Sequence, residues 1–351
     1  MANPKPFQTS KLFKSLEVSP QPPVLTDSFG RKHTYLRISL TERCNLRCTY
    51  CMPPEGVPLL PKEHLMNADE IFEIARQFVA AGVTKIRLTG GEPLVRKDFP
   101  RILKRLATLP VELSITSNGV TIDRHLDLLR DHGVRSINLS LDTLNAEKFQ
   151  RITFRNYFER VYANIFRLID AGFRTKVNAV LMRGTNEEEI VDFIELTRAH
   201  PLVVRFIEFM PFDGNRWNRD KTVSQAEILA RVQDHFGTDN VLRLQDAPHD
   251  TTRHYRIRGY AGTFGIISTV TNPFCDTCNR IRLTADGRLK NCLFSRTESD
   301  LLTPFRRGED IAPIVRQTVF GKHAMRGGLS KPEAFEDPAA HDNRSMIRIG
   351  G

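Results

Sequence analysis

Residues 35–51 read YLRISLTERCNLRCTYC, a short β-like run that leads directly into three cysteines. Successive side chains of a strand point to opposite faces. In this run one face would be apolar and the other polar, with Leu36, Ile38 and Leu40 set against Arg37, Ser39 and Thr41. The run therefore predicts a strand that is packed on one face, with Cys44, Cys48 and Cys51 on the loop at its carboxyl end.

The same kind of strand recurs between helical stretches as far as Pro211. The predicted strands are 35–40, 85–89, 112–116, 136–141, 175–181 and 203–207, and the predicted helices are 68–81, 123–131, 158–171 and 186–200. Regular strand–helix alternation implies a parallel sheet with right-handed crossovers. Six units fall short of the eight in a closed barrel. We therefore expect an α/β fold, an incomplete (βα)6 TIM-like barrel, with a flat doubly wound sheet as the alternative.

One face of these strands is polar, although a parallel sheet is ordinarily buried on both faces. Arg37, Arg87 and Lys176 all fall on the polar side. Long cationic side chains are seldom buried unless they are paired. The pattern favours a barrel interior that holds a ligand, and the alternative is a half-solvated sheet.

Beyond Pro211 the alternation stops. We expect a helix over 224–236 with a capping box of Ser224 and Glu227, β-like pieces over 255–259, 265–270, 281–284 and 289–293, and a helix over 310–320. The predicted organisation is a disordered extension at 1–23, a partial barrel at 24–221 and a C-terminal domain at 222–351.

The composition is that of a globular protein with an anionic partner. The 351 residues are 40% hydrophobic and carry a net charge of +10, without a run of 18 apolar residues that could span a membrane. The basic and aromatic residues are not arranged as in nucleic-acid-binding domains, which favours a polyphosphate ligand. Six cysteines in two close triads, without a signal-like segment, indicate metal or cluster ligands in the cytoplasm rather than three disulfides.

Three thiolates on one short loop can each bind a different iron of a [4Fe–4S] cluster. The motif Cys44-x3-Cys48-x2-Cys51 would leave the fourth iron without a protein ligand. A substrate could bind that iron, just as a substrate binds the open coordination position of a catalytic zinc ion. The alternative is a zinc site completed by His33 or His64. Zinc ligands usually come in spaced pairs, so the triple spacing favours the cluster.

With Tyr50 before its last cysteine, this loop resembles the motif of the radical S-adenosylmethionine enzymes. The resemblance implies that S-adenosylmethionine binds the open iron, and that one electron from the cluster cleaves it to give a 5′-deoxyadenosyl radical. The Gly-rich stretch at 89–93, TGGEP, closes the second strand, where the superfamily holds the methionine ammonium. By the same resemblance, the contacts to S-adenosylmethionine are Tyr50, Gly91, Ser140 and Met210.

A second triad has the spacing Cys275-x2-Cys278-x13-Cys292. Alone, its Cys-x2-Cys pair favours structural zinc. Combined with the first triad, with Arg280 and Arg282 and with the final Gly350-Gly351, it resembles the GTP 3′,8-cyclase family of molybdenum cofactor synthesis. The resemblance extends from about residue 35 to the end, includes RFIEFM at 205–210, and implies a second [4Fe–4S] cluster whose open iron binds guanine.

Arg280 and Arg282 are two residues apart, so they project from one face of a strand and suit a phosphate chain. The resemblance implies that the contacts to GTP are Arg37, Arg87, Thr116, Lys176, Arg280, Ile281 and Arg282. It also implies a lyase-type enzyme that converts GTP and S-adenosylmethionine to (8S)-3′,8-cyclo-7,8-dihydroguanosine 5′-triphosphate, 5′-deoxyadenosine and methionine. The tail would insert toward the active site, because glycines pass through narrow spaces.

The expected partners are GTP, S-adenosylmethionine, an electron donor and a cyclic pyranopterin monophosphate synthase that takes over the product. Nucleic acid and membrane are not expected as partners, and a homodimer is one option for the oligomeric state. Two rival functions stay open at this point. One is a peptide-modifying radical enzyme with an auxiliary cluster, and the other is a non-catalytic zinc- or cluster-binding interaction protein.

Overall fold

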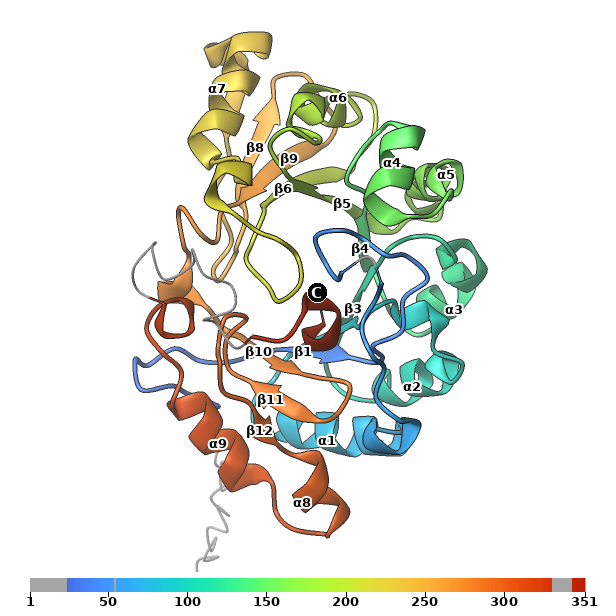
Figure 1. Cartoon of the computed structure of the whole chain (residues 1–351), viewed down its shortest axis with the longest axis vertical. Helices are drawn as coiled ribbons and strands as arrows, with labels where there is room; N and C mark the ends of the chain where they lie inside the picture. Colours follow the sequence, from blue (N-terminus) through green and yellow to red (C-terminus); the bar gives the residue numbers. More distant parts are fainter. Residues whose placement is uncertain (1–23, 54, 330–342, 351) are drawn as a thin grey trace, which may run out of the picture.

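A computed structural model of the chain describes residues 24–53, 55–329 and 343–350. Six parallel strands follow one another in chain order across the middle of a sheet (Figure 1). They are β1 Tyr35–Ser39, β2 Lys85–Thr89, β3 Glu112–Ser117, β4 Ser136–Ser140, β5 Arg174–Leu181 and β6 Val203–Glu208. In the described part of the chain the two ends of the sheet are not paired with each other. The predicted incomplete (βα)6 barrel is confirmed.

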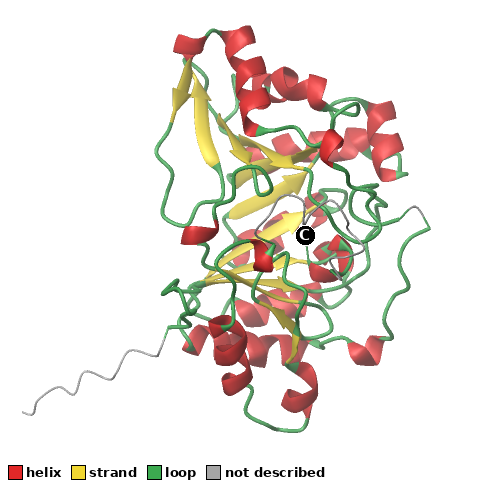
Figure 2. Ribbon diagram, turned by 60° about the vertical axis from the view of Figure 1, so that its left-hand side comes forward, coloured by secondary structure: helices red, strands yellow, loops and turns green. Residues whose placement is uncertain are grey.

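Helices connect these strands and surround the outside of the sheet (Figure 2). They are α1 Ala68–Ala80, α2 Phe99–Leu106, α3 Leu126–Asp131, α4 Ala146–Thr153, α5 Phe158–Asp170 and α6 Ile190–Glu195. The prediction missed α2 and α4, which have only eight residues each and so offer about two turns of periodicity. The predicted helix at 186–200 is longer than the α-helix observed, α6.

The C-terminal section extends the sheet at both edges. Strand β10 (Arg280–Leu283) pairs in parallel with β1, and β9 (Thr263–Ile267) pairs in parallel with β6. Antiparallel strands follow at each end, with β11 Arg288–Lys290 and β12 Ser299–Asp300 beyond β10, and β8 Arg253–Ile257 and β7 Val241–Arg243 beyond β9. The parallel part of the barrel therefore contains two strands more than the six predicted units.

Four further helices belong to this section: α7 Gln225–Phe236, α8 Leu302–Arg306, α9 Ala312–Phe320 and α10 Met346–Ile349. The capping box predicted for α7 is present, because the Ser224 hydroxyl accepts from the backbone of Glu227 while the Glu227 carboxylate accepts from the backbone of Ser224. The predicted extension at 1–23 lies outside the described residues. No described helix is long and apolar enough to cross a membrane.

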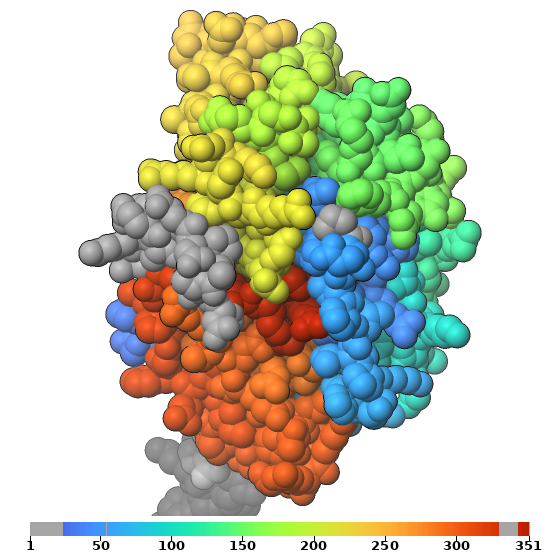
Figure 3. Space-filling model, viewed as in Figure 1, coloured from blue at the N-terminus to red at the C-terminus, as the bar shows by residue number. Residues whose placement is uncertain are grey.

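Burial follows the alternation read from the strands. The apolar residues of β1 and of its neighbours are fully buried beneath the helices, as Leu36, Ile38 and Ile86 show. They share one hydrophobic core with the C-terminal section, to which Ile281 and Leu289 also belong. In Figure 3 the last described residues lie in the centre of one face, between the segments near residues 50 and 215. The polar faces of the strands are left to form the inside of the barrel.

Candidate active site

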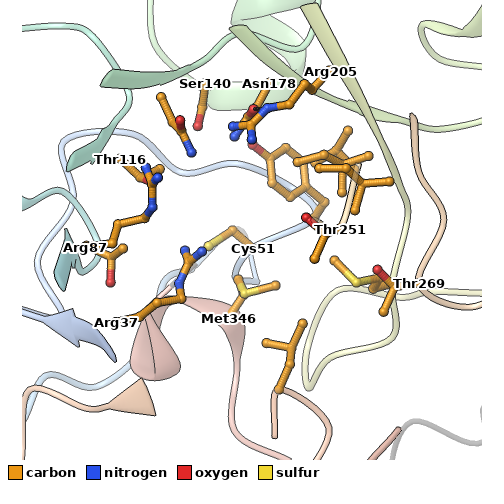
Figure 4. Close-up of a pocket in the computed structure, with 18 of the residues that line it drawn as sticks. Arg37, Cys51, Arg87, Thr116, Ser140, Asn178, Arg205, Thr251, Thr269 and Met346 are labelled. Atoms are coloured by element: carbon orange, nitrogen blue, oxygen red, sulfur yellow. Dashed lines mark hydrogen bonds between the residues drawn. The ribbon is translucent and has the colours of Figure 1, made fainter. Parts of the chain in front are cut away.

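A cavity of about 390 Å³ lies inside the barrel. Each of the six central strands contributes to its lining at least one polar side chain, including Arg37, Arg87, Thr116, Ser140, Asn178 and Arg205. Figure 4 shows these side chains around one open space together with Cys51 and Met346. The polar interior predicted from the strand pattern is confirmed.

The first triad is at the cavity wall, because Cys44, Cys48 and Cys51 all line it. Burial raises the pKa of all three thiols, that of Cys44 to about 11. Thiolates here would therefore need a positively charged group to stabilise them. The two backbone and side-chain donors to Cys44 Sγ, Leu46 N at 3.4 Å and Asn118 Nδ2 at 3.6 Å, are neutral.

The residues present fit an iron–sulfur cluster better than zinc. Within the described ranges, no three His, Cys, Asp or Glu side chains converge as they would on one metal ion. The two histidines considered for a zinc site do not line the cavity with the first triad. His64 is exposed in a short helical turn, whereas His33 is fully buried and contacts Lys322.

The glycine-rich loop after β2 packs against the cysteine loop after β1. Gly91 N donates to the carbonyl of Thr41 at 2.6 Å, and a Cβ at Gly91 would lie only 2.4 Å from the carbonyl oxygen of Arg43. Glu92 accepts from Ser117 Oγ at 2.9 Å and from the backbone of Asn118 at 2.6 Å. Burial raises the pKa of Glu92 to about 7. These contacts fix the cysteine loop to β2 and β3.

The other residues expected at S-adenosylmethionine, Tyr50, Ser140 and Met210, line the same cavity. Asn215 ties two of them together, because its amide donates to the carbonyls of Met210 at 2.8 Å and Tyr50 at 3.2 Å. Asp142 also lines the cavity beside Tyr50, and burial raises its pKa to about 6. Neither Asn215 nor Asp142 was predicted as a site residue.

The second triad opens into this cavity as well, since Cys275, Cys278 and Cys292 all line it. Its electrostatic environment differs from that of the first. Burial alone would raise the pKa of Cys278, but the nearby charges of Lys322 and Arg280 lower it to about 7. Burial still raises the pKa of Cys275 and that of Cys292, so Cys278 is the thiol of this triad whose cationic neighbours favour the thiolate.

A row of arginines crosses the sheet between the two triads. In the register of the sheet, Arg37 of β1 stands opposite Arg282 of β10 on one side and opposite Arg87 of β2 on the other. On the far side of the barrel, Arg205 donates to Asn178 Oδ1 at 2.9 Å, and Lys176 lies near it. Burial and the neighbouring cations lower the pKa of Arg205 to about 9 and that of Lys176 to about 8. Gathering like charges is costly unless an anion is bound.

Ile281, which we expected to contact GTP, is placed differently from its neighbours in the strand. Its side chain is fully buried in the hydrophobic core and does not line the cavity. The reason is the alternation of β10, which turns Arg280 and Arg282 to the opposite face.

Several lining residues were missed by the sequence analysis. Arg205 lines the cavity from the same face of β6 as Ile207, and because Val203 and Ile207 on that face are apolar, the alternation that identified Arg37 does not mark it. Asp250, Thr251 and Thr269 come from irregular segments of the C-terminal section. Such segments have no periodic pattern that would indicate their position.

Comparison with known proteins agrees with this geometry. The family model "Radical SAM superfamily" matches residues 38–197, and "Molybdenum Cofactor Synthesis C" matches residues 202–326. The chain is 48% identical to "GTP 3′,8-cyclase, mitochondrial" of Arabidopsis thaliana, over 95% of this chain and 85% of that protein. It is 40% identical to "GTP 3′,8-cyclase" of Peptoclostridium acidaminophilum, over 93% of this chain and 98% of that protein.

The chain belongs to the GTP 3′,8-cyclase family. It is also 45% identical to "Molybdenum cofactor biosynthesis protein 1" of Homo sapiens, although it spans only about half of that relative, 51% of its length. Membership of the radical SAM superfamily implies S-adenosylmethionine and a [4Fe–4S] cluster. The structure of Streptococcus suis SuiB bound to S-adenosylmethionine has a TM-score of 0.55 at 16% identity, over 78% of this chain and 65% of that chain, which shows a shared fold.

Proposed function

We propose that this chain is the GTP 3′,8-cyclase that carries out the first step of molybdenum cofactor synthesis. It would convert GTP and S-adenosylmethionine to (8S)-3′,8-cyclo-7,8-dihydroguanosine 5′-triphosphate, 5′-deoxyadenosine and methionine, as a lyase-type enzyme. The observation that carries the proposal is that both cysteine triads and a row of arginines line one cavity. The relatives named GTP 3′,8-cyclase support it.

The first triad would hold the [4Fe–4S] cluster that binds S-adenosylmethionine, and the second triad a [4Fe–4S] cluster that binds the guanine end of GTP. When bound and reduced, the first cluster supplies the electron that cleaves S-adenosylmethionine for hydrogen abstraction at the ribose C3′. Tyr50, Gly91, Ser140 and Met210 would contact S-adenosylmethionine. All four line the cavity that the first triad also lines.

The triphosphate would bind the cations of the barrel. Arg37, Arg87 and Arg282 stand side by side across three strands, so their guanidinium groups can each meet a phosphate oxygen. Lys176 and Arg280 line the same space, with Thr116 as a neutral donor. Any contact of Ile281 with GTP would have to come from its backbone, because its side chain lies in the core. Without an anion these charges repel one another, and a bound triphosphate would relieve that cost.

Binding also has to exclude water from the reacting atoms. The barrel and the C-terminal section surround the cavity, and the last helix brings Met346 to its wall. The Gly350-Gly351 tail would insert toward the substrates. Gly350 supports this role, because it lies against Ser39 and Thr89 inside the barrel.

The reaction requires an electron donor, and its product would pass to a cyclic pyranopterin monophosphate synthase. The six free cysteines suit a reducing compartment. We place the enzyme in the cytoplasm on this ground, although the Arabidopsis relative is named mitochondrial. A homodimer is the oligomeric state that we would test first.

Anaerobic reconstitution of the full chain with iron, sulfide and reductant tests the proposal. We expect formation of 5′-deoxyadenosine from S-adenosylmethionine, and a cyclised nucleotide when GTP is present. Absence of 5′-deoxyadenosine would contradict the enzyme assignment and favour a binding protein. Its formation with untouched GTP would contradict the cyclase and favour a peptide-modifying enzyme.

A further inference from the structure

A buried lysine lies behind the second triad. Lys322 is 3% exposed and does not line the cavity. Its ammonium lies 3.3 Å from Cys278 Sγ, 2.9 Å from the carbonyl oxygen of Arg280 and 3.0 Å from His33 Nε2. An ammonium group has three hydrogens to donate. All three hydrogens can therefore be donated to acceptors within the protein, and one of these acceptors is the sulfur of Cys278.

His33 holds this lysine in place. The imidazole is fully buried, and burial together with the charge of Lys322 lowers the pKa of His33 to about 4. The ring is thus neutral near pH 7, and Nε2 can accept a hydrogen bond from Lys322. His33 was one of the histidines considered for a zinc site, and this contact gives it a different task.

The turn that carries His33 is itself attached to the second triad. Asp27 pairs with Arg31 at 2.6 Å. The guanidinium of Arg31 donates to the carbonyls of Cys275 at 2.9 Å, Ala324 at 2.8 Å and His323 at 2.8 Å. The segment that follows Lys322 and the loop of the second triad are therefore held by the same short stretch of chain.

We propose that Lys322 is a positioning residue that raises the reduction potential of the cluster at the second triad, through a charge-assisted hydrogen bond to the thiolate of Cys278. This inference rests on the proposed function, which assigns a cluster to that triad. Reduction adds negative charge to a cluster and its thiolates. A buried cationic donor therefore stabilises the reduced form more than the oxidised form.

The first triad offers a contrast within the same molecule. Among the described residues, the hydrogen bonds to its sulfurs come from a backbone amide and the Asn118 amide, both to Cys44, and from the Tyr50 hydroxyl to Cys48, and none of these donors carries a charge. Hydrogen bonds to cluster sulfurs are a recognised control of potential. The structure therefore assigns the more easily reduced cluster to the second triad.

The test is a redox titration of the anaerobically reconstituted full chain, monitored by electron paramagnetic resonance. Signals are assigned by comparison with Cys48→Ala. Lys322→Met, which keeps the length of the side chain without a donor, should lower the equilibrium constant for one-electron reduction of the second cluster about tenfold, a shift of about 59 mV to more negative potential. Lys322→Arg keeps a cationic donor and should stay near the parent. The first cluster, which serves as the internal control, should not move.

If the reduction potential of the second cluster is unchanged in Lys322→Met, the inference is overturned. It is also overturned if the reduction potentials of both clusters shift by the same amount. If Lys322→Met loses the second cluster, the neutral Lys322→Gln decides by the same criteria. Loss of the second cluster in Lys322→Gln too would show that Lys322 holds the ligands in place rather than tuning them, and would also overturn the proposal. If the parent chain itself shows only one cluster, the proposed function fails before this inference is reached.

Discussion

The guanidinium of Arg282 donates a hydrogen bond of 2.5 Å to the carbonyl oxygen of Gly350. This bond joins strand β10, next to the second triad, to the last described residue of the chain. Gly350 has a φ of +75°, and a Cβ there would lie 2.7 Å from Thr89 Oγ1 and 3.0 Å from Ser39 Cβ. The end of the chain thus lies inside the barrel against β1 and β2, where a side chain has no room.

Gly350→Ala should lower the rate of GTP cyclisation by about 10²-fold, because the tail would be displaced from a site whose geometry governs the rate. Product formation by chromatography measures the effect, and the iron and sulfide content should stay at the parent level. Gly133→Ala is the matched control, since Gly133 has the same φ of +75° but no atom within 4 Å of its Cβ position. Equal rates in the two variants would show that the tail is idle, and removal of Gly350-Gly351 should reproduce the loss.

Gly91→Ala should remove the cluster of the first triad while sparing the second. The new methyl group would collide with the carbonyl of Arg43, on the cysteine loop, which lies only 2.4 Å from the Cβ position. Iron and sulfide content should fall by about half if each triad binds one cluster. Gly184→Ala has open space at its Cβ and serves as the control. Full iron content in Gly91→Ala would show that the loop tolerates the change.

The affinity for GTP should decline as the pH rises above about 8. Burial and the nearby charges of Arg205 and Arg87 lower the pKa of Lys176 to about 8. Below that pH the ammonium is charged and attracts phosphate, and above it the charge is lost. Bound triphosphate favours the protonated form, so binding and protonation are coupled.

Calorimetric titration of the chain with GTP on both sides of pH 8 measures this dependence. Lys176→Arg should keep its affinity to a higher pH than the parent chain, because a guanidinium holds its proton more firmly than an ammonium group in the same surroundings. Tyr35 also has a pKa lowered to about 8, chiefly because Arg87 counteracts the effect of burial. Tyr35→Phe therefore separates the two groups. A pH profile that Lys176→Arg leaves unchanged would contradict the role given to Lys176.

The two triads should be separable by single substitutions. Cys48→Ala removes a partly buried thiol of the first triad and should abolish 5′-deoxyadenosine formation, because an incomplete ligand set cannot hold the cluster. Retained cleavage of S-adenosylmethionine would refute its role as ligand. The variant should still show the signal of the second cluster.

Cys278→Ala should have the complementary effect. It should spare the first cluster and the uncoupled cleavage of S-adenosylmethionine, but lose GTP cyclisation by at least about 10²-fold. Chromatography of both products from the same reaction makes the measurement. Normal GTP turnover would mean that the second triad has a structural role only.

The barrel was predictable because strand residues alternate between two different environments. Leu36 and Ile38 went to the core, while Arg37 went to the cavity, as their order in the sequence indicates. The short helices α2 and α4 escaped prediction because two turns give a weak periodic signal. Strands β9 and β10 were predicted as β-like pieces, but their parallel pairing with β6 and β1 was not, because pairing between distant segments leaves no local trace.

Several contacts around the site depended on that same long-range pairing. Lys322 is distant in sequence from both His33 and Cys278, yet its ammonium contacts both. Arg282 and Arg87 flank Arg37 only because β10 and β2 pair with β1 in one register. Neither arrangement could be derived from spacing along the chain.

The sequence by itself determined the chemistry that the chain can hold: two cysteine triads, basic residues on the polar face of strands, and a glycine loop and tail. These follow from residue type and local spacing, which act over a few residues. Only the tertiary structure decided that both triads face one cavity and that a row of arginines lies between them. The physical reason is that the pairing of parallel strands and the burial of a shared core set distances between residues far apart in the chain.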